Sequence, residues 1–468
     1  MGSATFNHAR RSTLCSYLAL LFLFPILARS DDAKPVSYYH DLVPILKRSC
    51  TGCHHPGKLK GNLDLTTFAT LQKGGKDGPG FKAGEPDASK IIEEVSGAEP
   101  SMPKEGDPLS KEEIALLTRW IREGAKDDTP ADAGSFKLAA PPVYSTAPAV
   151  SSIAYSPDGK ILAVVGYHEV LLYDADANGP TARLVGESPQ LQSLAFSADG
   201  KLLAVAGGAP ARFGEIQIWD PLQHKQLNSF KISEDSLYGV SFSPGADRVA
   251  FGCGDKSVRV IAVADGKELM KFDNHTDWVL GTTFTVDGKR LVSGSRDRAM
   301  KLIEVANGQF VDDVNKLLEG VLCLARNPKE DLVAYGGDLG TPRLYRISDN
   351  QNRGGGDTAR DANLVREFER QPGAVRAIAY SPAGDSIAVG GMGGEVRLYK
   401  TGDGARLATL KGHEGAVFTI AFNPTTNQVC TAGFEGKLRI FNSTSGDLIK
   451  ALPAVPITAE KPVQKASK

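Results

Sequence analysis

The sequence contains few residues of several types for its length, and each shortage excludes a class of protein. Only 7% of the 468 residues are aromatic and only six are cysteines, of which Cys253, Cys323 and Cys430 are widely separated. An odd set of scattered cysteines does not form a disulfide framework, and we expect these three to be small buried side chains. The 54 Lys and Arg residues nearly balance the 55 Asp and Glu residues. A net charge of −1 provides little attraction for a polyanion, so nucleic acid is not expected as a partner.

Long apolar runs are also missing beyond the N-terminal region. Residues 1–30 contain three arginines and no acidic residue, and their apolar run, 14–27, is followed by Ala-Arg-Ser. This order is typical of a secretory signal peptide, and the run is shorter than the ~20 residues that a transmembrane helix needs. We therefore predict a signal peptide over 1–30 and an exported, periplasmic or otherwise extracytoplasmic protein with no later membrane span.

The rest of the chain has the composition of a globular protein, with 41% hydrophobic residues, and its length favours more than one domain. Residues 34–128 have the pattern of short helices. Residues 129–149 are rich in Pro, Ala and Ser and are predicted to be a linker. Residues 150–453 carry a repeat. Residues 454–468 have too little apolar content to pack, so we expect a disordered tail.

The repeat is marked by a Ser, Thr or Asn that follows an alternating apolar run and precedes a turn such as Pro157-Asp158-Gly159. Two further apolar runs separated by glycines follow each turn. A unit of about 40–45 residues with four strands is the signature of a propeller blade. Seven units predict an all-β, seven-bladed propeller, with these anchor residues: Ser156, Ser197, Ser243, Thr285, Asn327, Ser381 and Asn423.

Three features depart from a regular repeat. An aromatic residue precedes six of the anchors, but Arg326 stands in that place in the fifth repeat. The spacing is longer before Ser243 and before Ser381, which predicts loop insertions, most clearly over residues 350–361 with their three successive glycines.

Ring closure has two solutions in the sequence. Residues 447–452 can complete the last blade locally, or residues 136–140 can return to it. The pattern leaves both open.

The chemistry of the chain lies in its first half. Cys50-Thr-Gly-Cys53-His54 is the attachment motif of haem c. Cysteines three residues apart lie on one face of a helical turn, so both thiols reach the two vinyl groups of one porphyrin, and His54 supplies an axial imidazole. A zinc site needs a second pair of ligands and a thioredoxin-like pair needs a βαβ unit, and this half has neither pattern. We predict one covalently attached haem c whose iron is bound by His54.

Two predicted helices flank this motif. Residues 41–48 form a short helix leading into it, with Pro44 in the first turn. Ser110 and Glu113 form a capping box that begins a second helix, Gly124 ends it, and its apolar positions are Ile114, Leu117 and Ile121. Terminal helices beside a haem predict a small all-α domain of the cytochrome c type.

The second axial ligand can be narrowed by elimination. Met102 is the one methionine of residues 34–128 and lies between the motif and the last helix. His55 directly follows His54 and does not easily reach the opposite face of a porphyrin, whereas His40 can. Because His/Met ligation is common in electron-transfer haem proteins, we expect Met102, with His40 as the alternative.

Several short segments in order resemble the planctomycete-type cytochrome c domain over residues 36–126. The resemblance implies haem binding and electron transfer, with Cys50 and Cys53 as attachment sites and His54 and Met102 as axial ligands. It rests on Val43-Pro-Ile-Leu46, the Cys50–His54 motif, Lys60-Gly-Asn-Leu-Asp-Leu65, Gly84-Glu-Pro-Asp-Ala-Ser89, Met102-Pro103 and Leu117-Thr-Arg-Trp-Ile121.

The repeats resemble the WD-repeat family in pattern more than in letters. Trp219-Asp220 and Gly412-His413 match its two signature dipeptides, and Asn274-His275 is close to the second. His275, Ser293 and Asp297 share one repeat and have the residue types of a hydrolase triad. In WD-type blades these positions form a hydrogen-bonded network that braces the strands, so we interpret them as structural.

Two functions are therefore compared. The first is an exported one-electron carrier whose propeller docks on a redox partner protein. The alternative is a propeller-based periplasmic oxidoreductase that uses the cytochrome domain as its electron relay. This alternative needs cofactor ligands at the axis of the ring, whereas the propeller histidines are spread over different repeats: His168, His224, His275 and His413.

Overall fold

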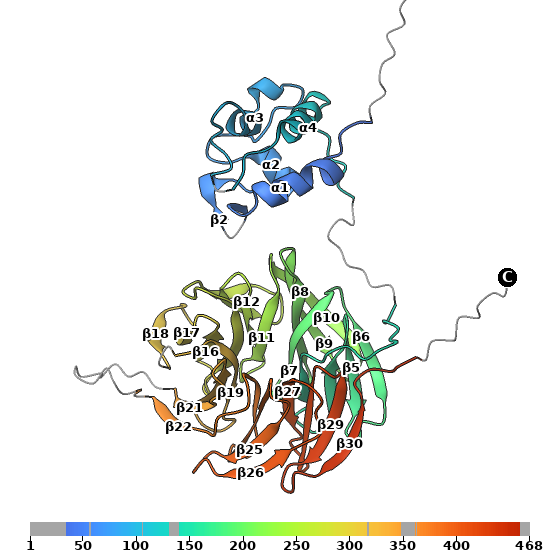
Figure 1. Ribbon diagram of the computed structural model, residues 1–468, viewed down its shortest axis with the longest axis vertical. Coiled ribbons are helices and arrows are strands. Elements are labelled where there is room, and N and C mark those ends of the chain that lie inside the picture. Colours follow the sequence, from blue (N-terminus) through green and yellow to red (C-terminus); the bar gives the residue numbers. More distant parts are fainter. Residues whose placement is uncertain are drawn as a thin grey trace, which may run out of the picture. The chain divides into compact units, whose positions relative to one another are not determined.

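The computed structural model describes residues 34–55, 58–104, 106–130, 140–315, 318–347, 361 and 363–458. The chain divides into two compact units between residues 133 and 134 (Figure 1). The predicted signal peptide, residues 1–30, lies outside the described residues. In the described part of the chain, no helix is long and apolar enough to cross a membrane.

The first unit consists of short helices and one small ladder. Strands β1 and β2 pair antiparallel, with His54 opposite Leu59. The sequence predicts an all-α unit, and this ladder shows that the unit also contains β-structure. The ladder forms because the chain reverses directly after the cysteines, where the Lys60 N–H donates to the Cys53 carbonyl at 3.3 Å. The elements are η1 (Tyr38–Leu42), α1 (Val43–Ser49), β1 (His54–His55), β2 (Lys58–Leu59), η2 (Lys60–Asn62), α2 (Phe68–Lys73), η3 (Pro86–Ala88), α3 (Lys90–Val95) and α4 (Lys111–Arg122).

The two helices expected beside the cysteine motif are present. Helix α1 has Pro44 in its first turn, where a missing N–H breaks no helical hydrogen bond. Helix α4 begins with the predicted capping box: the Ser110 hydroxyl accepts from the Glu113 N–H at 3.2 Å, and the Glu113 carboxylate accepts from the Ser110 N–H at 2.9 Å. Gly124 follows the helix with a φ of 98°, a conformation that favours glycine.

The core of this unit is centred on Trp120 of α4. The indole ring stacks on Tyr38 at 5.5 Å and meets the edges of Phe81 at 4.9 Å and Phe68 at 6.2 Å. An Arg48–Glu113 ion pair of 2.6 Å joins the end of α1 to the start of α4. The aromatic residues therefore hold helices that are individually too short to be stable in water.

The second unit is the predicted seven-bladed β-propeller. Its described residues form seven four-stranded antiparallel sheets, and each sheet is made of four consecutive strands (Figure 1). The first strand of each sheet contacts the first strand of the next, so these strands line the centre of the ring.

The strands of the first four sheets are β3 (Ile153–Tyr155), β4 (Ile161–Val165), β5 (Glu169–Asp174), β6 (Pro180–Val185), β7 (Gln190–Phe196), β8 (Leu203–Ala209), β9 (Phe213–Asp220), β10 (Lys225–Ser233), β11 (Leu237–Phe242), β12 (Arg248–Cys253), β13 (Val258–Ala262), β14 (Glu268–Phe272), β15 (Val279–Phe284), β16 (Arg290–Ser295), β17 (Met300–Glu304) and β18 (Phe310–Asp313). Those of the last three are β19 (Val321–Arg326), β20 (Leu332–Gly337), β21 (Arg343–Arg346), β22 (Leu364–Glu367), β23 (Val375–Tyr380), β24 (Ser386–Gly391), β25 (Val396–Lys400), β26 (Arg406–Leu410), β27 (Val417–Phe422), β28 (Gln428–Gly433), β29 (Lys437–Asn442) and β30 (Leu448–Pro453).

The anchor residues close the hairpin between the first and second strands of every blade. In all seven, the anchor N–H donates to the carbonyl oxygen five residues later, at 2.8–2.9 Å. The Ser156 hydroxyl shows why the residue type recurs: it donates to the Asp158 carboxylate at 2.6 Å and accepts from the Ile161 N–H at 3.0 Å. The periodicity of the sequence is thus the periodicity of one hydrogen-bonded turn.

One predicted insertion is absent. The long spacing before Ser243 is taken up by longer strands, β8 to β10, because the apolar run Leu203–Ala209 is buried along its whole length. The other predicted insertion, residues 350–361, lies outside the described residues except for Asp361. The fifth blade forms with Arg326 at the end of its inner strand.

The last blade is completed locally by β30, which pairs with β29. This decides between the two closures, although residues 136–139 of the other candidate lie outside the described part of the chain. The tail predicted from residue 454 begins later, because Ala454 and Val455 are buried in a core cluster that also contains Tyr144. Tyr144 and Ile457 form a parallel bridge, so the segment predicted as a linker over 129–149 joins the propeller before it ends. These apolar residues cover the seam between the first and last blades.

Candidate functional site

The cysteine motif forms a single hydrogen-bonded turn directly after α1. The Cys50 N–H donates to the Leu46 carbonyl at 2.8 Å, which ends the helix. The N–H groups of Cys53 and His54 both donate to the Cys50 carbonyl, at 3.1 and 3.2 Å. The bond from the His54 N–H to the Cys50 carbonyl has the spacing of an α-helical turn, so the two cysteines lie three residues apart on one such turn. Both are half-buried and neither forms a disulfide.

Burial governs the chemistry of Cys50. It raises the pKa of this thiol to about 11, and the charge of nearby Arg48 offsets only part of the effect. The thiol therefore stays protonated near neutral pH. A redox-active cysteine pair requires a lowered thiol pKa, so Cys50 does not have the properties of a thioredoxin-like nucleophile.

His54 is held in one orientation by the chain that follows it. The imidazole is only 9% exposed, and its Nδ1 lies 2.9 Å from the carbonyl oxygen of Lys60. The Leu65 N–H donates to the His54 carbonyl at 3.0 Å, which ties the returning loop to the motif. A ring that donates from Nδ1 to a carbonyl presents the lone pair of Nε2, the arrangement typical of a metal-binding histidine.

The candidates for the second axial position lie in different environments. Met102 is half-buried and packs against the core of the first unit, and its N–H donates to the Glu94 carbonyl at 2.9 Å. His40 is exposed on η1. The side chain of His55 lies outside what the structure describes. Of the two described candidates, Met102 is the one that contacts the apolar core.

These residues fit a covalently held porphyrin in their chemistry. The motif offers two free thiols and an oriented imidazole, and the adjoining core is apolar and aromatic. The hydroxyl of Tyr38 is buried there with no hydrogen-bond partner among the described residues, and burial raises its pKa to about 12. The described residues contain no group of three or more His, Cys, Asp or Glu side chains placed to hold a metal ion.

Two groups of the candidate haem site, the Lys60 carbonyl and the Tyr38 side chain, cannot be predicted from the cysteine–histidine motif. The Lys60 carbonyl acts through its backbone, and the one sequence signal for it is Gly61, which adopts a φ of 68° and turns the chain back over His54. Tyr38 precedes the predicted helix, and its burial depends on Trp120, far along the chain.

The triad-like residues of the propeller form the expected bracing network. His275 Nδ1 lies 2.7 Å from the Asp297 carboxylate and its Nε2 lies 2.8 Å from the Ser293 hydroxyl. The seventh blade repeats this arrangement at the same positions: His413 contacts Glu435 at 2.8 Å and Thr431 at 2.7 Å. A threonine and a glutamate in the second copy show that the geometry is structural. His168 and His224 lie in separate turns of other blades, so the four histidines are not brought together.

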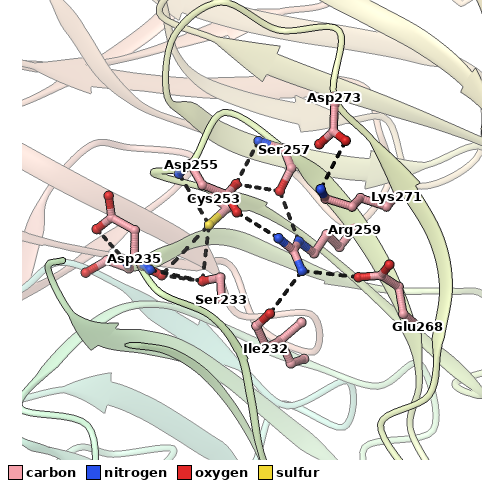
Figure 2. Close-up of polar contacts among 11 residues, drawn as sticks. Ile232, Ser233, Asp235, Cys253, Asp255, Ser257, Arg259, Glu268, Lys271 and Asp273 are labelled. Carbon is pink, nitrogen blue, oxygen red and sulfur yellow. Dashed lines mark hydrogen bonds and ion pairs between the residues drawn. The ribbon is translucent and has the colours of Figure 1, made fainter. Parts of the chain in front are cut away.

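The scattered cysteines are thiols within this framework. Cys253 and Cys430 are fully buried as expected, whereas Cys323 is half-buried. Figure 2 shows that Cys253 also has polar contacts: its sulfur lies 3.3 Å from the Ser233 hydroxyl and 3.5 Å from the Asp255 N–H. Asp255 in turn pairs with Arg259 at 2.7 Å (Figure 2). Burial raises the pKa of the Cys253 thiol to about 12, so it remains protonated.

Two protein-family models match the chain. Residues 50–106 match the family described as Planctomycete cytochrome C, beginning at the first cysteine of the motif. Residues 282–463 match a β-propeller family described as Nucleolar protein 10-like, N-terminal domain. No curated protein matches the chain. The predicted combination of a planctomycete-type cytochrome c segment with a β-propeller is confirmed by these matches and by the fold.

Proposed function

We propose that this protein is an exported c-type cytochrome that carries one covalently attached haem, and that its propeller docks it to a redox partner protein. The observation that carries the proposal is the environment of His54. This residue closes the turn formed by the two cysteines, and its Nδ1 is held by the carbonyl of Lys60 in the segment that follows. The match of residues 50–106 to a cytochrome c family supports it, as does the signal-like composition of residues 1–30.

Each residue has a distinct task in this proposal. When bound, the haem supplies an iron that changes its oxidation state by one electron. Cys50 and Cys53 would hold the group through thioether bonds, and His54 would hold its iron through Nε2. Met102 would add its thioether sulfur as the second ligand. The aromatic cluster around Trp120 would keep water from the group, and the short helices of the first unit are in keeping with this role.

The test is a pyridine haemochrome spectrum of the full chain, produced in a periplasm that contains haem-ligation machinery. We expect one haem per chain that stays with the polypeptide during acid–organic extraction. Cys50→Ala and Cys53→Ala each remove one thioether and shift the spectrum, whereas Cys430→Ala in the propeller does not. A colourless protein, or a haem that is fully extracted, would overturn the proposal.

Axial ligation has its own test. Met102→Ala should retain the covalent haem but lose the low-spin reduced spectrum. The matched control is Met392→Ala, which changes a methionine that is 56% exposed in the propeller. If Met102→Ala leaves the spectrum unchanged and His40→Ala alters it, the second axial ligand is His40.

The docking role rests on exposed apolar side chains in equivalent turns of adjacent blades. Each lies between the second and third strands of its blade, and each is at least half exposed: Tyr167, Leu339, Met392 and Phe434. Exposed apolar groups gathered in this way are typical of protein-binding surfaces. We expect Met392→Asp and Phe434→Asp to slow reduction of the haem by cell-envelope extract of the source organism but not by ascorbate. Equal rates in the variants and the parent would exclude docking through these turns.

A further inference from the structure

The hairpins that close the inner strands of four blades surround a pocket of about 290 Å³. It is lined from the fifth, sixth, seventh and first blades, which are consecutive around the ring. In each of these hairpins the residue before the anchor faces the pocket, together with the proline after the anchor. The positions before the anchors are Arg326, Tyr380, Phe422 and Tyr155.

Among the seven positions that precede the anchors, polar side chains occur only in the blades that line the pocket. The equivalent positions of the second, third and fourth blades are phenylalanines, Phe196, Phe242 and Phe284. The arginine and both tyrosines of the set of seven line the pocket. Six of the seven residues that precede the anchors are therefore aromatic, and the seventh, Arg326, is a cation.

The polar groups of the pocket lack partners. In the described part of the chain, Arg326 Nε and the hydroxyls of Tyr155 and Tyr380 are buried without any hydrogen bond. The guanidinium makes one bond, from Nη1 to the Asn327 carbonyl at 2.6 Å. Buried donors are almost always paired in native proteins, so three unpaired donors around one pocket require an explanation.

No acidic side chain neutralises Arg326 directly. Among the described residues the guanidinium has no ion pair, and its one hydrogen bond is to a backbone carbonyl. Burial lowers the pKa of the Arg326 guanidinium and the charge of Asp331 offsets only part of this effect, while the Asp331 carboxylate itself accepts from the Val286 N–H at 2.8 Å. Glu330 acts on Tyr380 electrostatically and is exposed. A cation in an apolar, proline-lined pocket is unfavourable unless an anion pairs with it.

We infer that this pocket binds a small organic carboxylate. The carboxylate pairs with the Arg326 guanidinium, and Tyr155 and Tyr380, whose hydroxyls are covered in the free protein, turn towards it to add their O–H groups as donors. The apolar body of the ligand packs against Phe422 and the prolines. The volume suits a molecule with a single ring, since it is at the lower end of the range for ligand pockets. This site is independent of the proposed haem in the first unit.

The experiment is calorimetric titration of the full chain with phenylacetate, its neutral analogue phenylacetamide, acetate and inorganic phosphate. We expect phenylacetate to bind at least about tenfold more tightly than the other three, because only it combines the charge with an apolar body. Absence of phenylacetate binding, or equal binding of acetate or phosphate, would overturn the inference.

Variants separate binding from a structural role. Arg326→Phe restores the aromatic residue of the other blades, so it should abolish phenylacetate binding while the melting temperature of the free protein stays equal or rises. Unchanged binding in Arg326→Phe contradicts the inference. If this variant fails to fold, Tyr380→Phe decides: it keeps the ring, removes one donor, and should weaken binding severalfold. The matched control is Tyr238→Phe, which removes a hydroxyl from a half-buried tyrosine of the third blade that does not line the pocket.

Discussion

The carbonyl oxygen of Lys60 lies 2.9 Å from Nδ1 of His54. This contact links a backbone group, which no substitution removes directly, to the side chain on which the proposed haem site depends. Its position is set by Gly61, whose φ of 68° disfavours any residue with a Cβ. A methyl group at Gly61 would meet no other atom within 4 Å, so a substitution there acts through the backbone alone.

Gly61→Ala should therefore raise the reduction potential of the haem-loaded protein. The strain of a left-handed alanine, about 1 kcal/mol, displaces the Lys60 carbonyl and weakens its bond to His54. The imidazole then donates less electron density, which destabilises the oxidised state. Redox titration of the full chain measures the shift. Gly84→Ala is the matched control, because Gly84 also has a positive φ and open space around it; an equal shift in both variants would contradict this role of Lys60.

The capping box of α4 gives a prediction for stability. Ser110→Ala removes the acceptor for the Glu113 N–H and should lower the free energy of unfolding of the first unit by about 1 kcal/mol. Denaturant unfolding followed by Trp120 fluorescence, in a background with Trp219 and Trp278 replaced by phenylalanine, measures the change, because this indole of α4 is buried against Tyr38, Phe68 and Phe81. Lys111→Ala, at the next and exposed position, should stay within about 0.5 kcal/mol of the parent. A larger loss from Lys111→Ala than from Ser110→Ala would refute the assignment of the cap.

The bracing network of the fourth blade makes the propeller sensitive to acid. Burial disfavours ionised Asp297, but the hydrogen bond and charge of His275 outweigh it and lower the pKa to about 2. Because the folded pKa lies below the unfolded value of about 3.9, this carboxylate stabilises the fold above about pH 4 and loses that effect as the pH falls towards 2. The stabilisation at neutral pH is of the order of 2 kcal/mol.

Asp297→Asn should accordingly lower the melting temperature at pH 7, and the difference from the parent should shrink as the pH falls from about 5 to 2. Scanning calorimetry across this range provides the measurement. Asp273→Asn changes an exposed carboxylate and should shift the curve little. A difference between Asp297→Asn and the parent that does not vary with pH would show that Asp297 does not act through its charge.

The seam of the ring depends on a buried polar contact. The Tyr144 hydroxyl donates to the fully buried Glu169 carboxylate at 2.7 Å, and Arg183 holds the same carboxylate at 2.5 and 2.7 Å. Tyr144→Phe leaves one carboxylate oxygen short of a donor and should destabilise the propeller by roughly 1–3 kcal/mol. Thermal unfolding measures the loss, with Tyr167→Phe as the control for removing a tyrosine hydroxyl. No change in Tyr144→Phe would show that Arg183 alone satisfies Glu169.

The propeller could be predicted from the sequence because its periodicity comes from a local interaction. Ser156 and its six equivalents bond within their own turns, so the pattern is visible without knowing which strands meet. The capping box of α4 was predictable for the same reason. Local hydrogen bonds leave local sequence signals.

What could not be predicted depends on contacts between distant segments. The burial of Ala454 and Val455 follows from their meeting with Tyr144, which lies about 300 residues earlier in the chain. An alanine and a valine after the last strand do not by themselves predict that the chain packs against Tyr144.

Within the residues that the structure describes, each blade is built from four consecutive strands, and the first and last sheets share none of them. Under tension applied at the two ends of the ring, the first and last blades can therefore separate once the isolated Tyr144–Ile457 bridge and the Val150–Gly433 backbone hydrogen bond are lost, while all seven sheets stay intact. These few backbone bonds and the side-chain packing around Tyr144 and Val455 resist separation at that point, and together they yield at lower force than the continuous row of backbone hydrogen bonds within a sheet. The propeller would therefore open at the seam between its first and last blades, after which the blades can unfold one after another.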